Sequence, residues 1–83
     1  MIKIPEQEEC EFADERRDYG CMTVWTCSWT PPGTEEGPWR TMIEWCHDGP
    51  PPTDIMNKAL KRQAYLRLCH MIWAHNRYEE QNA

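Results

Sequence analysis

The longest stretch of helix-forming residues runs from residue 53 to residue 78 and contains neither glycine nor proline. Three consecutive prolines end directly before it, which is typical of a helix start. At about 100° per residue, its apolar side chains form two stripes on roughly opposite sides. The first stripe comprises Met56, Leu60, Ala64, Leu68, Met71 and Tyr78, and the second comprises Ile55, Ala59, Leu66, Cys69 and Trp73. A sheet can cover the first stripe, so the second needs the N-terminal segment, a second subunit or a partner protein.

Two stretches that precede these prolines have the composition of β-strands. Residues 21–30 and 39–47 are rich in β-branched and aromatic residues, which strands favour. The connection between them, residues 31–38, contains three prolines and two glycines and is typical of a turn. Together the three stretches predict an antiparallel hairpin.

The register of this hairpin decides which side chains it buries. We assume that the connection is symmetric about Thr34. Trp29 then lies opposite Trp39, and Trp25 lies opposite Ile43. One face carries Cys21, Thr23, Trp25, Cys27, Trp29, Trp39, Thr41, Ile43 and Trp45, and the other carries Met22, Val24, Thr26, Ser28, Arg40, Met42, Glu44 and Cys46. The tryptophan-rich face is expected to pack on the helix, and a slip of one residue in one strand would reverse that strand's faces.

The first 20 residues give weaker structural signals. Residues 2–4 alternate between isoleucine and a polar residue and predict a short strand at the edge of the sheet. Residues 6–19 predict either a short helix, with Phe12, Arg16 and Tyr19 on one side, or an ordered loop.

The chain has 83 residues, enough for one domain with a small core. Its five tryptophans can each bury about 150–250 Å², and they suit either that core or a binding surface. The expected fold is a small α+β domain of residues 1–83, in which an antiparallel β-hairpin packs on one long C-terminal helix. If residues 2–4 pair with this hairpin, the sheet has three strands.

Charge is unevenly distributed along this acidic chain, whose formal net charge is −5. Residues 1–20 and residues 21–54 each carry a net charge of −4, whereas residues 55–83 carry +3. Phosphate groups are bound by clustered lysine and arginine, so we expect neither direct nucleic-acid binding nor membrane binding. A protein with a basic surface is the expected partner.

The beginning of the chain, MIKIPEQEEC, lacks the apolar region of a signal peptide. No apolar run approaches the ~18 residues of a membrane span. A cytoplasmic protein is therefore expected, with its cysteines reduced, and their odd number fits free thiols. They are Cys10, Cys21, Cys27, Cys46 and Cys69.

The cysteines and histidines do not form a recognisable metal or catalytic motif. The pairs at 46–47 and 69–70 are adjacent, and no two cysteines have the Cys-x-x-Cys spacing of zinc sites. His70 and His75 lie about 140° apart around a helix. A cysteine nucleophile would need a histidine brought close by the fold. We therefore expect no enzymatic activity and no cofactor, and a small zinc-stabilised domain is kept as an alternative.

Acidic side chains are the candidate partner-binding residues. Those of the N-terminal segment and of the hairpin connection would steer the protein toward a basic surface, and exposed tryptophan or methionine would anchor it there. The residues are Glu8, Glu9, Glu11, Asp14, Glu35 and Glu36. The function expected from them is that of a small non-enzymatic protein-binding module.

In length, acidity and lack of a catalytic motif, the chain resembles the small inhibitors that bacteriophages encode against host defence systems, including anti-CRISPR proteins. This resemblance implies an inhibitor of a basic nucleic-acid-binding surface, acting in the host cytoplasm. It is a resemblance of size and charge, so it assigns no role to any residue. A homodimeric structural or regulatory protein, with the C-terminal helix as its interface, is the alternative.

Overall fold

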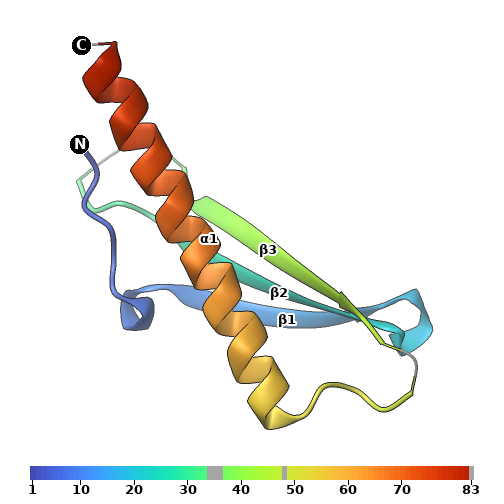
Figure 1. Ribbon diagram of the computed structural model, residues 1–83. Helices are drawn as coiled ribbons and strands as arrows, with labels where there is room; N and C mark the ends of the chain where they lie inside the picture. The colour runs from blue at the N-terminus through green and yellow to red at the C-terminus, as the bar shows by residue number, and fades with distance from the viewer. Residues whose placement is uncertain (34–36, 48, 83) are drawn as a thin grey trace.

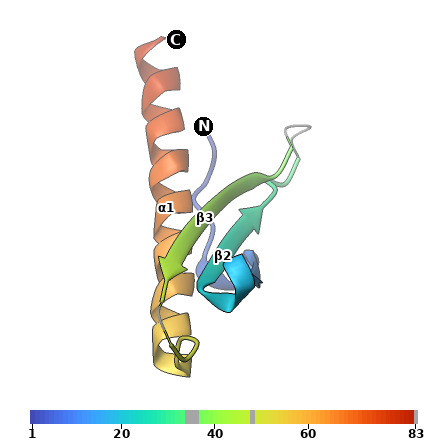
Figure 2. The ribbon, with the colours of Figure 1, turned by 90° about the vertical axis from the view of Figure 1, so that its right-hand side faces the viewer.

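The computed structural model describes residues 1–33, 37–47 and 49–82. Three antiparallel strands, in the order β1-β2-β3, form a sheet that packs against one face of a long helix (Figures 1 and 2). The elements are η1 (Gln7–Glu9), β1 (Glu11–Arg17), η2 (Asp18–Gly20), β2 (Met22–Trp29), β3 (Trp39–Cys46) and α1 (Asp54–Gln81). The predicted α+β class is confirmed.

The β2–β3 hairpin has the predicted register. Trp29 pairs with Trp39, and Trp25 pairs with Ile43. On the face predicted to meet the helix, Thr23, Cys27, Trp29, Thr41 and Ile43 are buried, because alternate side chains of a strand point to the same side. Thr34, on which the register was centred, lies outside the described residues.

The third strand is β1, so the prediction of a strand at residues 2–4 was wrong, as was that of a helix or loop throughout residues 6–19. β1 pairs with β2 along its whole length, although five of its seven residues are charged. The open edge of β2 offers backbone hydrogen bonds to whichever segment lies beside it, and a charged sequence is typical of an edge strand. The turn into β2 then uses left-handed backbone at Asp18, Tyr19 and Gly20, with φ of 52°, 58° and 89°.

Residues 1–5 run alongside α1 (Figure 1). The Asn76 amide accepts a hydrogen bond from the Ile2 backbone N–H at 2.8 Å and donates one to the Ile2 carbonyl at 2.7 Å. The Tyr65 hydroxyl donates a hydrogen bond to the Pro5 carbonyl at 2.7 Å. These bonds attach the N-terminal segment to one flank of the helix.

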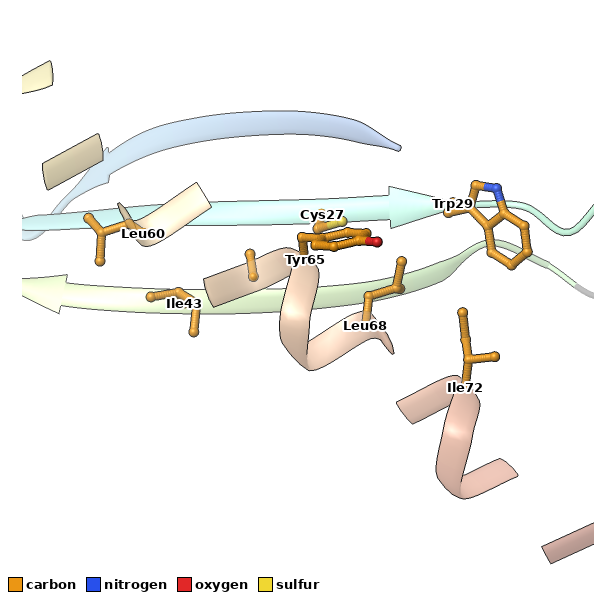
Figure 3. Packing of buried hydrophobic residues seen from close by; sticks show 8 residues of the cluster. Cys27, Trp29, Ile43, Leu60, Tyr65, Leu68 and Ile72 are labelled. Atoms are coloured by element: carbon orange, nitrogen blue, oxygen red, sulfur yellow. The ribbon is translucent and has the colours of Figure 1, made fainter. Parts of the chain in front are cut away.

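The main core lies between α1 and the inner face of the sheet (Figure 3). It contains Cys27, Trp29, Ile43, Leu60, Ala64, Tyr65, Leu68 and Ile72. Leu60, Ala64 and Leu68 belong to the predicted first stripe, but Met71 and Tyr78 of that stripe are exposed. The helix of 28 residues, roughly 42 Å long, extends beyond strands of eight residues, roughly 27 Å long, so the sheet covers only part of it.

Only part of the second apolar stripe of α1 is covered by the residues that the structure describes. Cys69 packs against the core. Ile55, Leu66 and Trp73 remain exposed, at 82%, 49% and 49% of their surface. Cys69 is therefore the member of the second stripe that packs against the core, and Ile55, Leu66 and Trp73 are left open by the described residues. No helix in the described ranges is both long enough and apolar enough to span a lipid bilayer.

Candidate functional site

An open groove lies between α1 and the edge strand β3. Its volume is about 770 Å³. The lining residues are Thr41 and Met42 of β3 and Gln63, Leu66, Arg67, His70 and Met71 of α1. Positions 63, 66, 67, 70 and 71 recur at intervals of three and four, so they share one side of the helix over two turns. We call this feature the α1–β3 groove.

Large apolar side chains of the α1–β3 groove are exposed. Met42, Leu66 and Met71 retain 41%, 49% and 37% of their surface. Trp73, which is 49% exposed, lies about one helical turn after the groove residue His70 and stacks on it. Contiguous apolar surface of this kind on a small protein marks interaction sites more often than single exposed side chains do.

The polar side chains of the groove are basic or neutral. Arg67 Nη1 donates a hydrogen bond to the Met42 carbonyl at 3.2 Å. His70 stacks on Trp73, with ring centroids 5.6 Å apart, and the Arg77 guanidinium lies 5.1 Å from the Trp73 ring centroid. No carboxylate lines the groove among the described residues. The α1–β3 groove is thus apolar with a positive rim.

The bond from Arg67 also affects the edge of the sheet. His47 N–H donates to the Cys21 carbonyl at 2.8 Å, so the backbone groups of His47 point toward the neighbouring strand. Along an antiparallel edge strand, the backbone N–H and C=O groups point to the neighbour at every second residue. Met42 lies five positions before His47, so its backbone groups point away from β2. The Arg67 side chain therefore occupies an outward-facing carbonyl near the middle of β3. A further strand adding at this edge would have to share or displace that bond.

The predicted acidic residues lie elsewhere on the molecule. Glu8 and Glu9 are in η1 and Glu11 begins β1, where Glu9 and Glu11 line one hollow of about 540 Å³. Glu9 also accepts the Glu6 backbone N–H at 3.1 Å. We call Glu8, Glu9 and Glu11 the acidic corner.

The other predicted acidic residues do not belong to this corner. Asp14 pairs with Trp25 and Glu11 with Ser28, so the two carboxylates point to opposite faces of the sheet. Glu35 and Glu36 lie outside the described residues. The acidic corner therefore contains three of the six predicted residues.

The cysteines nearest the core are poor nucleophiles. Burial raises the pKa of the Cys27 thiol from 9.0 to about 12, and the neighbouring Cys10 adds to this effect. Burial also raises the pKa of Cys10. A hydrogen bond with Cys69 raises the pKa of Tyr65, and burial adds to it. Thiols kept protonated in this way pack as small apolar groups.

The histidines and cysteines of the described ranges form no metal site. No group of three or more Cys, His, Asp or Glu side chains there is placed to hold a metal ion. His47 Nε2 lies 3.2 Å from Thr23 Oγ1, so this ring interacts with the sheet.

Sequence reasoning did not identify the α1–β3 groove. It assigned Leu66 to one stripe and Met71 to the other, and it placed Met42 on the face of the hairpin opposite the tryptophans. The three side chains meet only because α1 crosses next to the edge of β3. The sequence feature that could have indicated the groove was the second apolar stripe of the helix, which the sheet was not expected to cover.

No protein-family model, curated protein or solved structure matches this chain.

Proposed function

We propose that this protein is a small non-enzymatic module that binds another protein through the α1–β3 groove. The observation that supports it is the exposure of Met42, Leu66 and Met71 around a single groove. Each side chain is about half exposed, so covering it would contribute roughly 1 kcal/mol to binding. Methionine adapts its shape to a partner and is enriched at interfaces.

The environment of the reactive side chains favours binding over catalysis. His70, the histidine of the groove, stacks on Trp73. Cys27 is fully buried, and its raised pKa keeps it protonated. A cytoplasmic location is part of this proposal, because the expected free thiols persist in a reducing compartment.

Replacing Leu66 with aspartate should abolish most of this binding. A carboxylate buried without a partner at an interface is strongly unfavourable, so we expect the Kd to rise at least about tenfold. The partner is first recovered from the native host on immobilised wild-type protein and purified, and its affinity for each variant is then measured by calorimetry.

Ile55→Asp is the matched control, because Ile55 is an exposed apolar residue of the same helix that does not line the groove. Circular dichroism checks that both variants are folded. A partner that binds the wild type and Leu66→Asp with equal affinity would rule out the groove as its docking site.

A second candidate function uses the acidic corner. Glu9 and Glu11 line a common hollow, and Glu8 is exposed in the adjoining η1. Such a corner would steer the protein toward a basic surface. An inhibitor of a nucleic-acid-binding protein would act in this way.

Reversing the charge of Glu8 and Glu11 to lysine tests this candidate. With a basic partner we expect association at low salt to slow by about ten- to a hundredfold, and its salt dependence to flatten. Stopped-flow fluorescence at several ionic strengths measures both. Glu9 is left unchanged because it accepts the Glu6 N–H. Asp14→Lys, on the opposite face of β1, is the control, and equal rates for all three proteins would exclude steering by this corner.

A further inference from the structure

We infer that the α1–β3 groove binds a short amphipathic helix that carries carboxylates beside its apolar face. This inference rests on the proposed function and names the chemistry of the partner.

The charges around the groove indicate an acidic partner. Arg67 lines it, Arg77 lies further along the same helix beside Trp73, and no carboxylate lines it among the described residues. A guanidinium has five N–H donors, and one of those on Arg67 reaches the Met42 carbonyl. The remaining donors suit a partner carboxylate, which guanidinium groups bind in a bidentate manner.

The shape of the groove favours a helix over a strand. A strand would have to add to the edge of β3, where the Arg67 side chain already bonds the outward-facing Met42 carbonyl. The groove residues of α1, from Gln63 to Met71, rise by roughly 12 Å, which equals about two helical turns. A partner helix can therefore place apolar residues at i, i+3 or i+4, and i+7 between Leu66, Met71 and Met42.

The charges of this chain argue against a second copy as the occupant. Two copies facing each other across the groove about a two-fold axis would bring Arg67 of one copy toward Arg67 of the other. Tyr19, which is fully exposed, lies in the left-handed turn into β2 and not in an α-helix. The acidic segment before it, residues 6–18, offers no exposed large apolar side chain to fill the groove. Its one large apolar residue, Phe12, is half-buried, with Lys61 Nζ 4.9 Å from its ring centroid.

Selection from a random peptide library tests the inference without a known partner. Random 16-residue peptides are displayed and selected on the immobilised full-length protein, and those that also bind Leu66→Asp are removed. We expect the remaining peptides to combine apolar residues at helical spacing with two or more acidic residues. Synthetic copies are then titrated against the protein and against variants by fluorescence polarisation.

Two independent changes probe the carboxylate contact. Arg67→Gln should weaken binding about tenfold, whereas Arg62→Gln, whose side chain bonds Gln7 outside the groove, should not. Replacing glutamate by glutamine in the peptide should weaken binding of the unmodified protein equally, and this second test does not depend on how well the Arg67 variant folds.

Each other result overturns the inference. Groove-binding peptides that are neutral, basic or strand-like would exclude an acidic helix and leave the proposed function standing. Failure to recover any peptide that depends on Leu66 would remove the inference, whereas the proposed function is judged by the affinity of the purified partner for Leu66→Asp. A wild-type dimer in light scattering that Leu66→Asp converts to a monomer would assign the groove to a second copy.

Discussion

Replacing Leu68 with alanine is expected to lower the free energy of unfolding by roughly 3–5 kcal/mol. Leu68 has no exposed surface and lies in the cluster between α1 and the sheet (Figure 3). The substitution removes buried methyl groups and leaves a cavity that rigid neighbours fill only in part. A domain of this size has little stability to spare, so a measurable fraction of the variant should be unfolded at room temperature.

Leu66→Ala provides the matched control for Leu68→Ala. It is the same substitution two positions earlier in α1, where the leucine is 49% exposed, and it should change the free energy of unfolding by less than about 1 kcal/mol. Urea titrations followed by tryptophan fluorescence compare the two variants with the wild type. Equal losses at both positions would contradict the burial assigned to the two faces of the helix.

Alkaline pH is expected to destabilise the protein through its buried thiols. The pKa of Cys27 is raised from 9.0 to about 12 in the fold, chiefly by burial. The unfolded chain therefore loses this proton at a lower pH than the folded protein does. The stabilising contribution is fully present below about pH 9 and is lost as the pH rises toward 12. Between pH 9 and 10.5, Cys27 alone should lower the free energy of unfolding by roughly 1–2 kcal/mol.

Urea titrations at several pH values measure this decline. Cys10 and Tyr65, whose pKa values are also raised, act in the same direction, so Cys27→Ala should reduce the decline without removing it. Ile43→Val is the control, because it destabilises the same core without removing a titratable group. If the free energy of unfolding falls as steeply with pH in Cys27→Ala as in Ile43→Val, Cys27 is not the source of the decline.

The hairpin register was predictable because it depends on short-range regularities. Alternation within residues 21–30 and 39–47 assigned the tryptophans to one face, and the length of the connection aligned Trp29 with Trp39. Val24 is an exception, since it is buried although it lies on the predicted outer face. Alternation identifies the side of a sheet, whereas burial also depends on neighbouring strands.

The groove and the third strand were not predictable in the same way. The sequence of β1 is mostly charged and has no apolar alternation that predicts a strand. The segment becomes a strand because β2 offers it an unpaired edge. Leu66, Met71 and Met42 belong to two predicted elements, and their meeting depends on how those elements pack. The acidic residues were read as one group because they are close in sequence, yet Glu11 and Asp14 point to opposite faces of the sheet.

By itself the sequence determined where α1 begins and how β2 and β3 pair. The Thr53 side chain that follows the prolines accepts the Met56 N–H and caps the helix, and the side chains of the hairpin alternate with the period of a strand. These properties arise between residues a few positions apart. Only the tertiary structure decided which flank of α1 stays open and where the acidic residues gather, because both depend on how the helix crosses the sheet.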